Sequence, residues 1–600
     1  MRIDKLYVKG FRNFSDETIV FQPKTLIIGA NDVGKTNLLY CLRILFDKSL
    51  SDRDLELLDS DYNAYSKTDY IEITAELSDV TEDCLISTFA GALKDNRVLI
   101  RYCKRKNEPF AFFVGSEESL LSEISGRSYY IRRVNMQCVD TNRDLFSFLK
   151  RERIQLLKLS KERLSKEEQA EDSDSVTGIQ NDLDTINGKV NSLHYVSSAL
   201  TKVNQELSEL SIHNEDQSIR FIAGESDAAK LLDNLILSYS TDTNPLSLGG
   251  DGRNNQIFMA AWIAKQEIEK NVDHVIFYAI EEPEAHLHPH QQRKLSDYIQ
   301  NHFQGQIFIT SHSPQIASKF NPKNIVRLFS KNKYSYAACG GCSELLEKAL
   351  HDFGYRLNAL SSEVFFADGV FLVEGTSEVL FYSSLADELD FDLDRSNISV
   401  LSVDGIGFFP YIAVCSALSI PWAVRTDNDI FSKSQGPFTV QYYAGISRAM
   451  DIFQAVSDKD EPLLQYWSTH IGENEWQADG DIPSEASLLN DRIRGEICKQ
   501  GIFLAEKDLE TDLANSSVQE DLLSFYNEES LPALIQSMKK RKATNMFSFL
   551  HEKNDSLKKL ADSNLVLPLL YLQTRVEEGM HPNGDKDSNS RAETGDRLRW

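Results

Sequence analysis

The feature that most constrains the fold is GANDVGKT at residues 29–36, which fits the pattern G-x-x-x-x-G-K-[ST] in full. The apolar run TLII (25–28) precedes it, and NLLYCLRILF (37–46), with apolar residues at helical spacing, follows it. A strand, a glycine turn and a helix in this order direct backbone N–H groups at phosphates bound to the helix N-terminus. The segment therefore predicts an α/β nucleotide-binding domain, in which Lys35 reaches the β- and γ-phosphates and Thr36 supplies a hydroxyl to magnesium.

Two later strand ends provide the other groups that a nucleotide site needs. VIFYAIEEPEAHLHP (275–289) is an apolar run that ends in Glu281 and Glu282, where one acid can hold the magnesium shell and the next can activate water. QIFITSHSP places His312 directly after a further apolar run, at the position of a γ-phosphate sensor. The glycine turn SLGGDGRNN (247–255) opens a helix and can present N–H groups to a nucleotide on a second subunit.

Strand–helix alternation occurs twice along the chain, at 274–330 and at 369–430. This alternation is typical of βαβ units and parallel sheets. Between 70 and 115, segments of strand length with polar breaks predict an antiparallel sheet. Residues 145–215 predict long helices interrupted by a solvated or disordered acidic connection at EEQAEDSDS.

Composition limits the function classes less than the motifs do. No apolar run is long enough for a membrane helix, and the N-terminus lacks the h-region of a signal peptide. Eight scattered cysteines then predict reduced thiols in a cytoplasmic protein. The net charge of −27 repels nucleic acid at long range, although carboxylates that bind cations are included in that sum. Basic stretches at 101–106, 127–133 and 538–542 still allow a local nucleic-acid track, and the first two are more typical of solvated faces.

A second pair of strand ends is acidic. In FLVEGTSEVL an apolar run ends at Glu374, Gly375 lets the backbone turn, and Glu378 follows one helical turn later. In AVRTDNDIF another apolar run ends in Asp427 and Asp429. Each half alone is a common strand-to-loop turn, but ligands in open parallel sheets collect at the carboxyl ends of strands. Four carboxylates converging there would repel one another unless cations lie between them, and Mg²⁺ or Mn²⁺ suits oxygen-only ligands. Two such ions can promote in-line phosphodiester cleavage.

Two other groups of potential metal ligands fit simpler interpretations. His286, His288 and His290 follow the acidic strand with alternate spacing, and without an evident fourth ligand they fit a loop better than a metal site. Cys339 and Cys342 form a single C-x-x-C, which is too little to indicate zinc or redox chemistry without a second pair.

The nucleotide motifs together resemble an ABC-type ATPase head of the RecF/SMC kind, and the resemblance is carried by FRNF, GANDVGKTN, the glycine turn, EEPEAHLHP and SHSP. It implies a head dimer that binds ATP with Mg²⁺ and in which Ser247–Gly250 contacts the nucleotide of the other subunit. The residues that it places at the nucleotide are Gly29, Asn31, Gly34, Lys35, Thr36, Asn37 and Glu281. The first acid of the pair is usually Asp, and the longer arm of Glu281 makes hydrolysis a weaker expectation than binding.

The acidic strand ends resemble a Toprim domain. An ATPase head followed by a Toprim domain with E-G-x-x-E resembles the nucleases of the OLD (overcoming lysogenisation defect) family, most closely its Gabija-type members. The resemblance covers about residues 1 to 560 and is carried further by FADGVFLVEG, TDND and DLE. It implies that Glu374 is a metal ligand and the base for the attacking water, with Glu378, Asp427 and Asp429 completing the metal shells.

The same resemblance implies three further residues, which lie in less distinctive local sequence. Asp508 and Glu510 match the acids expected at the second ion, and Lys542 matches the basic residue expected to stabilise charge on the scissile phosphate. In isolation, Lys542 equally fits an ordinary basic helix face. In LSVDGIGF the chain has Asp404 where the similar chains have glycine, so this residue is either an extra ligand or a loop residue.

We therefore expect an α/β chain with an ABC-type head, a helical insertion, a Toprim domain and helical C-terminal elements. The expected divisions are the N-terminal lobe of the head (1–145), a helical insertion with a dimerisation role (146–215), the C-terminal lobe of the head (216–345), the Toprim nuclease domain with helical additions (346–560) and a C-terminal segment (561–600), disordered from 577.

The resemblance implies an ATP-regulated, divalent-metal endonuclease that cleaves double-stranded DNA in anti-phage defence. It further implies a homo-oligomer, either a dimer or a dimer of dimers, and a companion helicase of the GajB type. Two alternatives stay open: a nucleotide-dependent DNA-binding scaffold of the SMC kind, and a topoisomerase or primase. The complete acid set argues against the scaffold. The lack of a domain resembling a tyrosine-bearing cleavage domain or a zinc-binding primase module argues against the second alternative.

Overall fold

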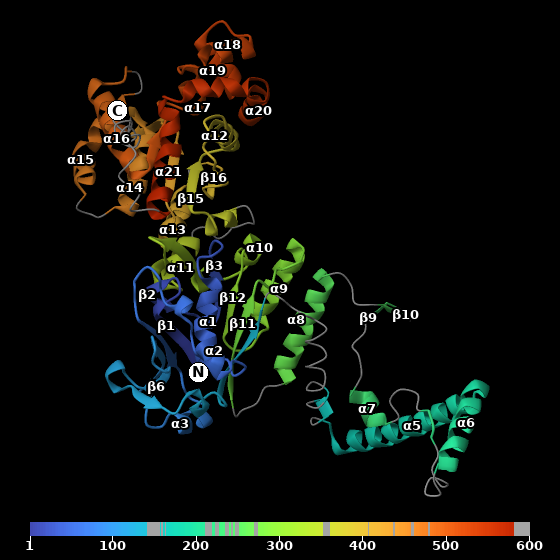
Figure 1. The fold of residues 1–600 in the computed structure, drawn as a ribbon. Coiled ribbons are helices and arrows are strands. Elements are labelled where there is room, and N and C mark those ends of the chain that lie inside the picture. Colours follow the sequence, from blue (N-terminus) through green and yellow to red (C-terminus); the bar gives the residue numbers. More distant parts are fainter. Residues whose placement is uncertain are drawn as a thin grey trace. The chain divides into compact units, whose positions relative to one another are not determined.

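The chain divides into two compact units in the computed structural model (Figure 1). Unit 1 comprises Met1–Val139, Asp273–Glu284 and Pro289–Trp600, and unit 2 comprises Asp140–Val272 and Ala285–His288. The structure describes residues 1–140, 157, 160–161, 164–210, 219–221, 227–233, 239–241, 244–246, 251–268, 274–351, 361–405, 407–435, 438–457, 461–477 and 480–580.

The nucleotide motifs lie on one sheet of unit 1, with strand order β14-β13-β3-β12-β11-β8. Its strands are β3 (Lys24–Ile28), β8 (Val134–Val139), β11 (Val275–Glu281), β12 (Ile307–Thr310), β13 (Ile325–Lys331) and β14 (Tyr334–Ala337). All neighbouring pairs are parallel except β13 and β14. The carboxyl ends of β3, β12 and β11 therefore meet at one edge, which confirms the predicted α/β architecture around the glycine loop.

A second, antiparallel sheet of unit 1 has the order β2-β1-β4-β5-β6-β7. Its strands are β1 (Arg2–Phe11), β2 (Phe14–Val20), β4 (Tyr70–Ser78), β5 (Val98–Arg105), β6 (Ala111–Gly115) and β7 (Ser122–Ile124). Helix α1 (Lys35–Phe46) contacts strands of both sheets, and its apolar face, including Leu38 and Phe46, is fully buried in their common core. The antiparallel sheet predicted between 70 and 115 is confirmed.

The first two basic stretches are used within the fold. Arg101 forms ion pairs with Glu72 and Glu118 on the surface of the antiparallel sheet. Lys104 is buried against Glu56, and the Arg127 guanidinium donates to the backbone oxygens of Asp47 and Leu50. Protein groups thus bind Arg101, Lys104 and Arg127, whereas the other basic residues of the two stretches, Arg105, Lys106, Arg132 and Arg133, are exposed.

Unit 2 contains the helices of the insertion, and one expectation about them is wrong. Its described elements are α5 (Lys166–Asn191), α6 (His194–Leu210), α7 (Ala228–Asp233), β9 (Tyr239–Thr241), β10 (Asn244–Leu246) and α8 (Asp251–Ile268). The acidic run EEQAEDSDS, expected to interrupt the helices, forms the first turns of α5. Ser165 and Glu168 make a reciprocal capping box there, and carboxylates are favourable at the positive end of a helix dipole.

The predicted second parallel sheet is confirmed, with strand order β16-β15-β17-β21 and every pair parallel. Its elements are β15 (Gly369–Val373), α12 (Thr376–Glu388), β16 (Ile398–Ser402), α13 (Phe409–Ala417), β17 (Trp422–Thr426) and β21 (Ile502–Leu504). All five residues of β15 are buried, as expected for a central strand covered on both faces.

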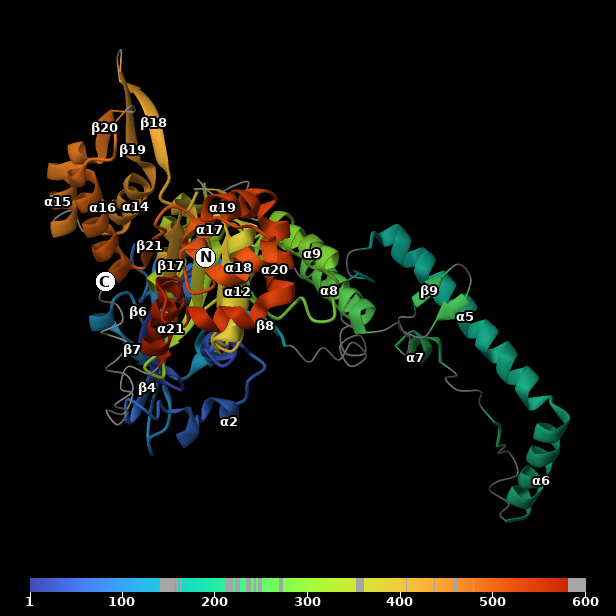
Figure 2. The ribbon, with the colours of Figure 1, turned by 90° about the horizontal axis from the view of Figure 1, so that it is seen from above.

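An insertion between β17 and β21 contains a three-stranded antiparallel sheet that the sequence did not predict. The sheet comprises β18 (Ile430–Gln435), β19 (Phe438–Tyr443) and β20 (Glu475–Gln477). Helices α14 (Ala444–Val456) and α15 (Pro462–His470) lie between β19 and β20 in the chain, and α16 (Ser484–Ile497) follows β20. Figure 2 shows the β18–β19 hairpin extending away from the neighbouring helices. The hairpin begins directly after Asp429, so the acidic turn of β17 leads into it.

The C-terminal helices complete the second parallel domain. They are α17 (Leu509–Ala514), α18 (Gln519–Tyr526), α19 (Leu531–Lys539), α20 (Lys542–Lys553) and α21 (Leu567–Met580). Helix α20 packs on α12, and α21 packs on β15 and β17. Helix α21 includes residues 577–580, for which disorder was expected, and residues 581–600 lie outside the described part of the chain.

The first turn of α14 approaches the acidic turn after β17 more closely than a side chain allows. A Cβ at Gly445 would lie 2.5 Å from both the Asn428 Cα and the Asp427 carbonyl oxygen. We predict that Gly445→Ala destabilises the folded protein by about 1–3 kcal/mol, because the backbone must shift to admit the methyl group. Gly495→Ala on α16 is the control, since its Cβ would meet open space and alanine favours the helix by up to about 1 kcal/mol. Thermal denaturation of both variants measures the difference, and equal midpoints would contradict the close approach.

Candidate functional site

The loop between β3 and α1 has the geometry of a phosphate cradle. Gly29 and Gly34 have φ angles of 149° and 100°, and a Cβ at Gly29 would lie 2.4 Å from the backbone oxygen of Leu328. The Lys35 ammonium donates to the backbone oxygens of Gly29 (2.9 Å) and Ala30 (2.7 Å) across the loop. Burial lowers the pKa of Lys35 to about 8, and within the described residues this ammonium forms no ion pair. A bound phosphate would supply the missing counter-charge, so the residues fit a nucleotide.

The remaining motif residues divide into two groups. Asn31 and Thr36 are exposed at the loop, where a nucleotide or its magnesium can reach them. Asn37 is instead held by the FRNF turn, because Arg12 donates to its side-chain oxygen (2.6 Å) and its amide donates to Asn13 (2.8 Å). Asn37 thus fixes the start of α1 against the first strand pair, and a direct contact with nucleotide stays a prediction.

The structure brings His312 and the second acid of β11 together beside the lysine. Glu282 Oε1 lies 3.4 Å from His312 Nε2, and the Glu282 backbone, with a φ of 44°, donates to Thr310 at the end of β12. Burial, reinforced by the charge of Lys35, lowers the pKa of His312 and favours the neutral imidazole. A neutral imidazole next to a carboxylate can accept or donate one hydrogen bond to a phosphate or water. Glu281 lies one residue earlier, at the carboxyl end of β11.

Sequence reasoning missed Glu284, which supports this histidine. Its Oε1 accepts hydrogen bonds from the Ser311 hydroxyl (2.7 Å) and from the His312 backbone N–H (2.6 Å). Its Oε2 is buried without a hydrogen-bond partner, and burial raises the pKa of Glu284. The third acid of EEPE was a visible signal, although only the fold shows that it holds the turn after β12.

Several other sequence expectations have simple structural outcomes. Ser247–Gly250, expected to contact a second nucleotide, lie outside the described residues. Cys339 donates to the Ala417 backbone oxygen (2.8 Å), whereas Cys342 is half-buried beside Thr25, and the two thiols have separate surroundings. Within the described part of the chain no group of three or more His, Cys, Asp or Glu has the arrangement of a metal site, and this includes the three histidines after β11.

At the second parallel sheet, Glu374 joins the ends of β15 and β17. Its Oε1 accepts hydrogen bonds from the Thr426 hydroxyl (2.5 Å), the Asp427 backbone N–H (2.9 Å) and the Arg448 guanidinium (2.8 Å). The two acidic strand ends therefore meet, as predicted. Arg448, from α14, carried no motif that could have identified it.

Glu378 is placed differently from the expectation that it faces the same point as Glu374. Its Oε2 accepts the backbone N–H groups of Glu374 (2.7 Å) and Gly375 (3.1 Å), as in a capping box at the start of α12. Its Oε1 accepts a hydrogen bond from Arg425 (2.9 Å), and the side chain is buried. Glu378 thus orients the turn that carries Glu374, and a role as a metal ligand stays a prediction.

Two arginines neutralise this edge of the sheet. Arg425, which is 3% exposed, binds Glu378 and Asp512 (2.6 Å), and lies 4.0 Å from Asp427. Since Arg425 and Arg448 already occupy oxygens of Glu378 and Glu374, the carboxylates are not gathered around one vacant point. A removal of either arginine would leave buried carboxylates without a counter-charge.

Asp427 has a carboxylate oxygen that faces Arg425 at 4.0 Å but accepts no hydrogen bond. Its Oδ1 is buried without a hydrogen bond, and burial raises its pKa from 3.8 to about 8. Asp429 lies two residues later at the same turn and is half-buried. A buried carboxylate oxygen without a hydrogen bond is the donor type that Mg²⁺ and Mn²⁺ prefer, so Asp427 fits a divalent cation as one ligand, while the described acids around it do not have the arrangement of a complete metal site.

The downstream residues expected at the second ion lie in two ion pairs. Asp508 caps α17, accepting hydrogen bonds from Thr511, and pairs with Lys539. Burial alone would raise the pKa of Asp508, but the hydrogen bonds from Lys539 and Thr511 outweigh it and lower that pKa. Glu510, which is 2% exposed, accepts a hydrogen bond from Lys542 (3.0 Å) at the start of α20.

Lys542 also faces the strand ends. Its positive charge lowers the pKa of Asp427 and so partly offsets the effect of burial. Asp404 is exposed and accepts a hydrogen bond from Ser402 (2.9 Å), while the neighbouring Gly405 N–H donates to the Glu374 backbone oxygen (2.9 Å). These contacts assign Asp404 to the loop that flanks Glu374.

Two family models match the chain, one over the head and one over the Toprim sheet. Residues 365–429 match the family model of the overcoming lysogenization defect protein-like TOPRIM domain, and residues 24–318 match a AAA domain model described for AbiEii toxin of type IV toxin–antitoxin systems. The chain therefore has an OLD-like Toprim domain and a AAA-type ATPase domain, which confirms the resemblance found in its motifs.

Individual relatives extend this similarity over almost the whole chain. The chain is 27% identical to Endonuclease GajA of Bacillus cereus, over 94% of this chain and 100% of that protein. It is 30% identical to the OLD nuclease of Thermus scotoductus, over 35% of this chain and 41% of that protein. Among solved structures, the Smc head bound to the C-winged helix domain of ScpA covers 56% of this chain and 97% of that chain, with 16% identity and a TM-score of 0.36.

The raised pKa of Asp427 predicts a pH dependence of stability. Because the folded, metal-free protein binds this proton more tightly than the unfolded chain, stability falls as the pH rises from about 4 to about 8. We expect the thermal midpoint in chelator to decrease over that window, and Mn²⁺ to restore it more strongly at the alkaline end. Asp427→Asn should flatten the profile, while Asp404→Asn should keep it. An unchanged profile in Asp427→Asn would show that another group titrates.

Proposed function

We propose that the protein is a divalent-metal-dependent endonuclease for double-stranded DNA, that nucleotide at its ATPase head regulates cleavage, and that it acts in anti-phage defence. The observation that carries the proposal is the hydrogen bond from the Asp427 backbone N–H to Glu374, which joins the two acidic strand ends at the carboxyl edge of a parallel sheet. The names of the relatives, Endonuclease GajA and OLD nuclease, support the same reaction class.

The residues have separable roles in this proposal. Glu374, Asp427 and Asp429 would hold Mg²⁺ or Mn²⁺, with Glu378, Asp508 and Glu510 as further ligands or supports. Two ions bound there supply an activated water and charge stabilisation for an in-line displacement. Glu374 is also the group that can take the proton of the attacking water. Lys542 can stabilise negative charge on the scissile phosphate, which requires that it exchange its contact with Glu510 for the phosphate.

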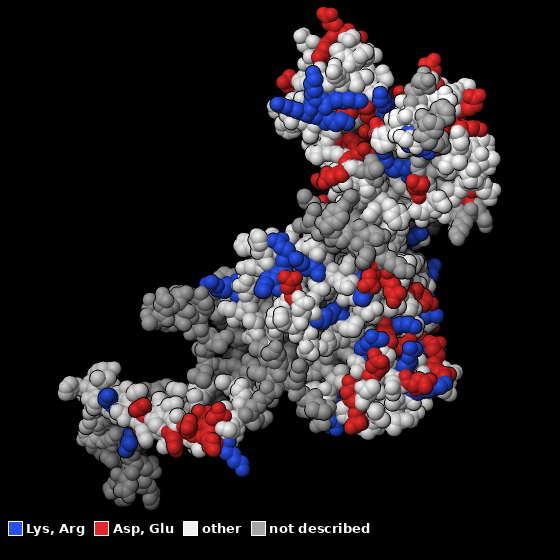
Figure 3. All heavy atoms as spheres, turned by 180° about the vertical axis from the view of Figure 1, so that it is seen from behind, with Lys and Arg blue, Asp and Glu red and all other residues white. Residues whose placement is uncertain are grey.

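A short basic segment offers a path for the DNA backbone beside this site. Lys539 ends α19, Lys540 and Arg541 form the turn, and Lys542 begins α20. Figure 3 shows Lys and Arg side chains gathered over this region next to acidic ones. Lys539 and Lys542 pair with acids of the site, whereas Lys540 and Arg541 are exposed and form no ion pair with any described residue. Two free cations next to the carboxylates can hold phosphates on either side of the scissile bond.

The assembly and setting belong to the same proposal. ABC-type heads bind nucleotide between two subunits, so we propose a homo-oligomer, a dimer or a dimer of dimers, with a GajB-like helicase as companion. None of the eight cysteines forms a disulfide, and reduced thiols are consistent with the proposed cytoplasmic site of action. No helix among the described residues has the length and apolar character to cross a membrane.

Plasmid cleavage in Mg²⁺ or Mn²⁺ tests the reaction. We expect Glu374→Gln to reduce cleavage about a hundredfold or more, because the amide neither carries the charge that holds the cation nor accepts the water proton. Asp404→Asn is the matched control, one loop away and paired only with Ser402, and should cleave like the wild type. Intact plasmid with every metal tested would favour the alternative, an SMC-like nucleotide-dependent DNA scaffold.

DNA affinity tests the basic path separately from catalysis. The double variant Lys540→Ala/Arg541→Ala should bind duplex DNA more weakly and flatten the dependence of log K on log salt by about 2, one unit for each lost phosphate contact. Lys94→Ala, on an exposed lysine paired with Glu117 in the head, serves as control. A salt dependence equal to that of the wild type would place the DNA elsewhere.

Nucleotide turnover tests the head. Lys35→Met should abolish ATP binding, because the phosphate loses its buried ammonium. Glu282→Gln should retain binding and lose hydrolysis, if the carboxylate beside His312 activates the water. Equilibrium binding and phosphate release measured on both variants separate the two steps, and hydrolysis unaffected in Glu282→Gln would assign the activation of water to another group.

A further inference from the structure

A buried arginine connects the two parallel sheets of unit 1. Arg327 lies on β13, in register with Ile28, the last residue of β3 before the phosphate loop. It is 3% exposed. Its neighbour Leu328 presents the backbone oxygen against which Gly29 packs without room for a Cβ. A displacement of Gly29 therefore displaces β13 as well, because the two backbones are in van der Waals contact with no space between them.

The guanidinium of Arg327 points away from this sheet to the starts of the Toprim strands. Its Nη2 donates to the Ala367 backbone oxygen (2.8 Å) and to Asp368 Oδ1 (3.2 Å), directly before β15. Its Nη1 donates to the Leu418 backbone oxygen (3.1 Å), in the turn that leads into β17. One cation thus holds the starts of the two strands whose opposite ends carry Glu374 and Asp427.

The third strand of the Toprim sheet is attached to the same point. Asp368 Oδ2 accepts a hydrogen bond from the Asn397 amide (3.2 Å), and the Asp368 backbone N–H donates to the Asn397 oxygen (2.9 Å), directly before β16. The Val370 N–H donates to the Pro421 oxygen (2.9 Å), which ties the starts of β15 and β17 to each other. The strand starts therefore respond together to a force on Asp368.

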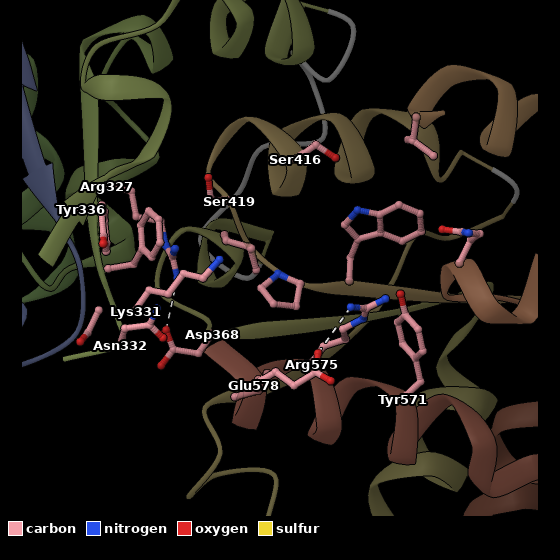
Figure 4. A pocket seen from close by; sticks show the side chains of 18 of the residues that line it. Arg327, Lys331, Asn332, Tyr336, Asp368, Ser416, Ser419, Tyr571, Arg575 and Glu578 are labelled. Atoms are coloured by element: carbon pink, nitrogen blue, oxygen red, sulfur yellow. Dashed lines mark hydrogen bonds and ion pairs between the residues drawn. The ribbon is translucent and has the colours of Figure 1, made fainter. Parts of the chain in front are cut away.

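A cavity of about 940 Å³ lies beside this junction. Figure 4 shows Arg327 and Asp368 on one wall and Arg575, Glu578 and Tyr571 on another, with Arg575 paired to Glu578 of its own helix. The bonds of Arg327 join the two sheets at the wall of this cavity, together with the packing of α11 (Glu344–His351) on α13 and the hydrogen bond from Cys339 to Ala417. An apolar residue could cover the core equally well, but it would make none of the three directed bonds.

We propose that Arg327 is a positioning residue that transmits the nucleotide state of the phosphate loop to the strands carrying Glu374 and Asp427. The path runs from Gly29 through Leu328 and Arg327 to Asp368, and it uses the rigidity of hydrogen-bonded parallel strands. This inference deepens the proposed function, since it assigns the residue through which nucleotide regulates cleavage. A merely stabilising role for Arg327 predicts something different. In the proposed role, a variant of Arg327 loses the effect of nucleotide on the Toprim strands but keeps both nucleotide binding and nucleotide-free cleavage.

Hydrogen–deuterium exchange tests the transmission without relying on cleavage. In the wild-type protein a non-hydrolysable ATP analogue with Mg²⁺ should change the exchange of peptides covering 369–374 and 422–427. In Arg327→Met the same analogue should still bind and protect the phosphate loop, while its effect on those two strands disappears. Arg575→Met, in the wall of the same cavity but paired within its own helix, should respond like the wild type.

Cleavage provides the second readout. Coupling between two sites typically changes a rate or affinity by about fivefold or more. In the wild type, nucleotide should therefore change the cleavage rate by about that factor in one direction or the other. In Arg327→Met the rates with and without nucleotide should be about equal. Arg327→Lys, which keeps the charge and can reach fewer of the three acceptors, should give an intermediate ratio and guards against a variant that fails to fold. Arg327→Met, Arg327→Lys and Arg575→Met should all retain cleavage in the absence of nucleotide.

The outcomes distinguish the inference from the proposed function. A nucleotide effect on the Toprim strands that persists in Arg327→Met and Arg327→Lys overturns the inference, as does a wild-type protein whose strands do not respond to nucleotide. Absence of cleavage in the wild type overturns the proposed function instead, and the exchange experiment still decides whether Arg327 carries the structural response. A loss of nucleotide-free cleavage or of nucleotide binding in folded Arg327→Lys would assign the residue a structural role and reject the proposal.

Discussion

Buried carboxylates at the ends of parallel strands must be neutralised, and much of the structure around both sites serves that requirement. Parallel pairing brings the carboxyl ends of neighbouring strands to one edge, so acids that lie far apart in the sequence become close neighbours. At the Toprim sheet the compensating cations are Arg425 and Arg448, and at the head Glu284 is held instead by hydrogen bonds from the Ser311 hydroxyl and the His312 backbone N–H. Without these cations the desolvation of the acids would outweigh what their strands gain by packing.

One carboxylate at the Toprim edge is not fully satisfied, because Asp427 retains a buried oxygen with no hydrogen bond. A carboxylate in that position binds a proton more tightly than usual, and a divalent cation can replace the proton with a stronger interaction. Arg448 donates to Glu374 and to the Asp427 backbone oxygen, so it holds the two acidic turns together when no cation is bound. The site can thus persist in a folded chain before it acquires metal.

Local sequence predicted the parts of the fold that depend on short-range rules. The glycine loop, both strand–helix alternations and the antiparallel segments before residue 115 followed from periodicity and turn residues. The acidic run of α5 was misjudged because charge was weighed above the capping pair Ser165 and Glu168. Glu374 and Asp427 were predicted to meet, whereas Arg425, Arg448 and Glu284 were missed, since their partners come from other elements and no spacing rule connects them.

The junction between the sheets shows why an arginine suits a connection between two sites. A hydrophobic contact stabilises a junction through area and tolerates sliding, whereas a guanidinium binds several acceptors in a fixed plane. Arg327 uses that plane to hold a carbonyl oxygen before β15, a carboxylate shared with β16, and a carbonyl oxygen before β17. Each strand that leaves this point ends at the acidic edge, so a small rotation at the start of the sheet becomes a change in the spacing of the carboxylates. The spacing of those carboxylates is the quantity on which cation binding depends, and it can thereby be set from the nucleotide site without any direct contact between the two.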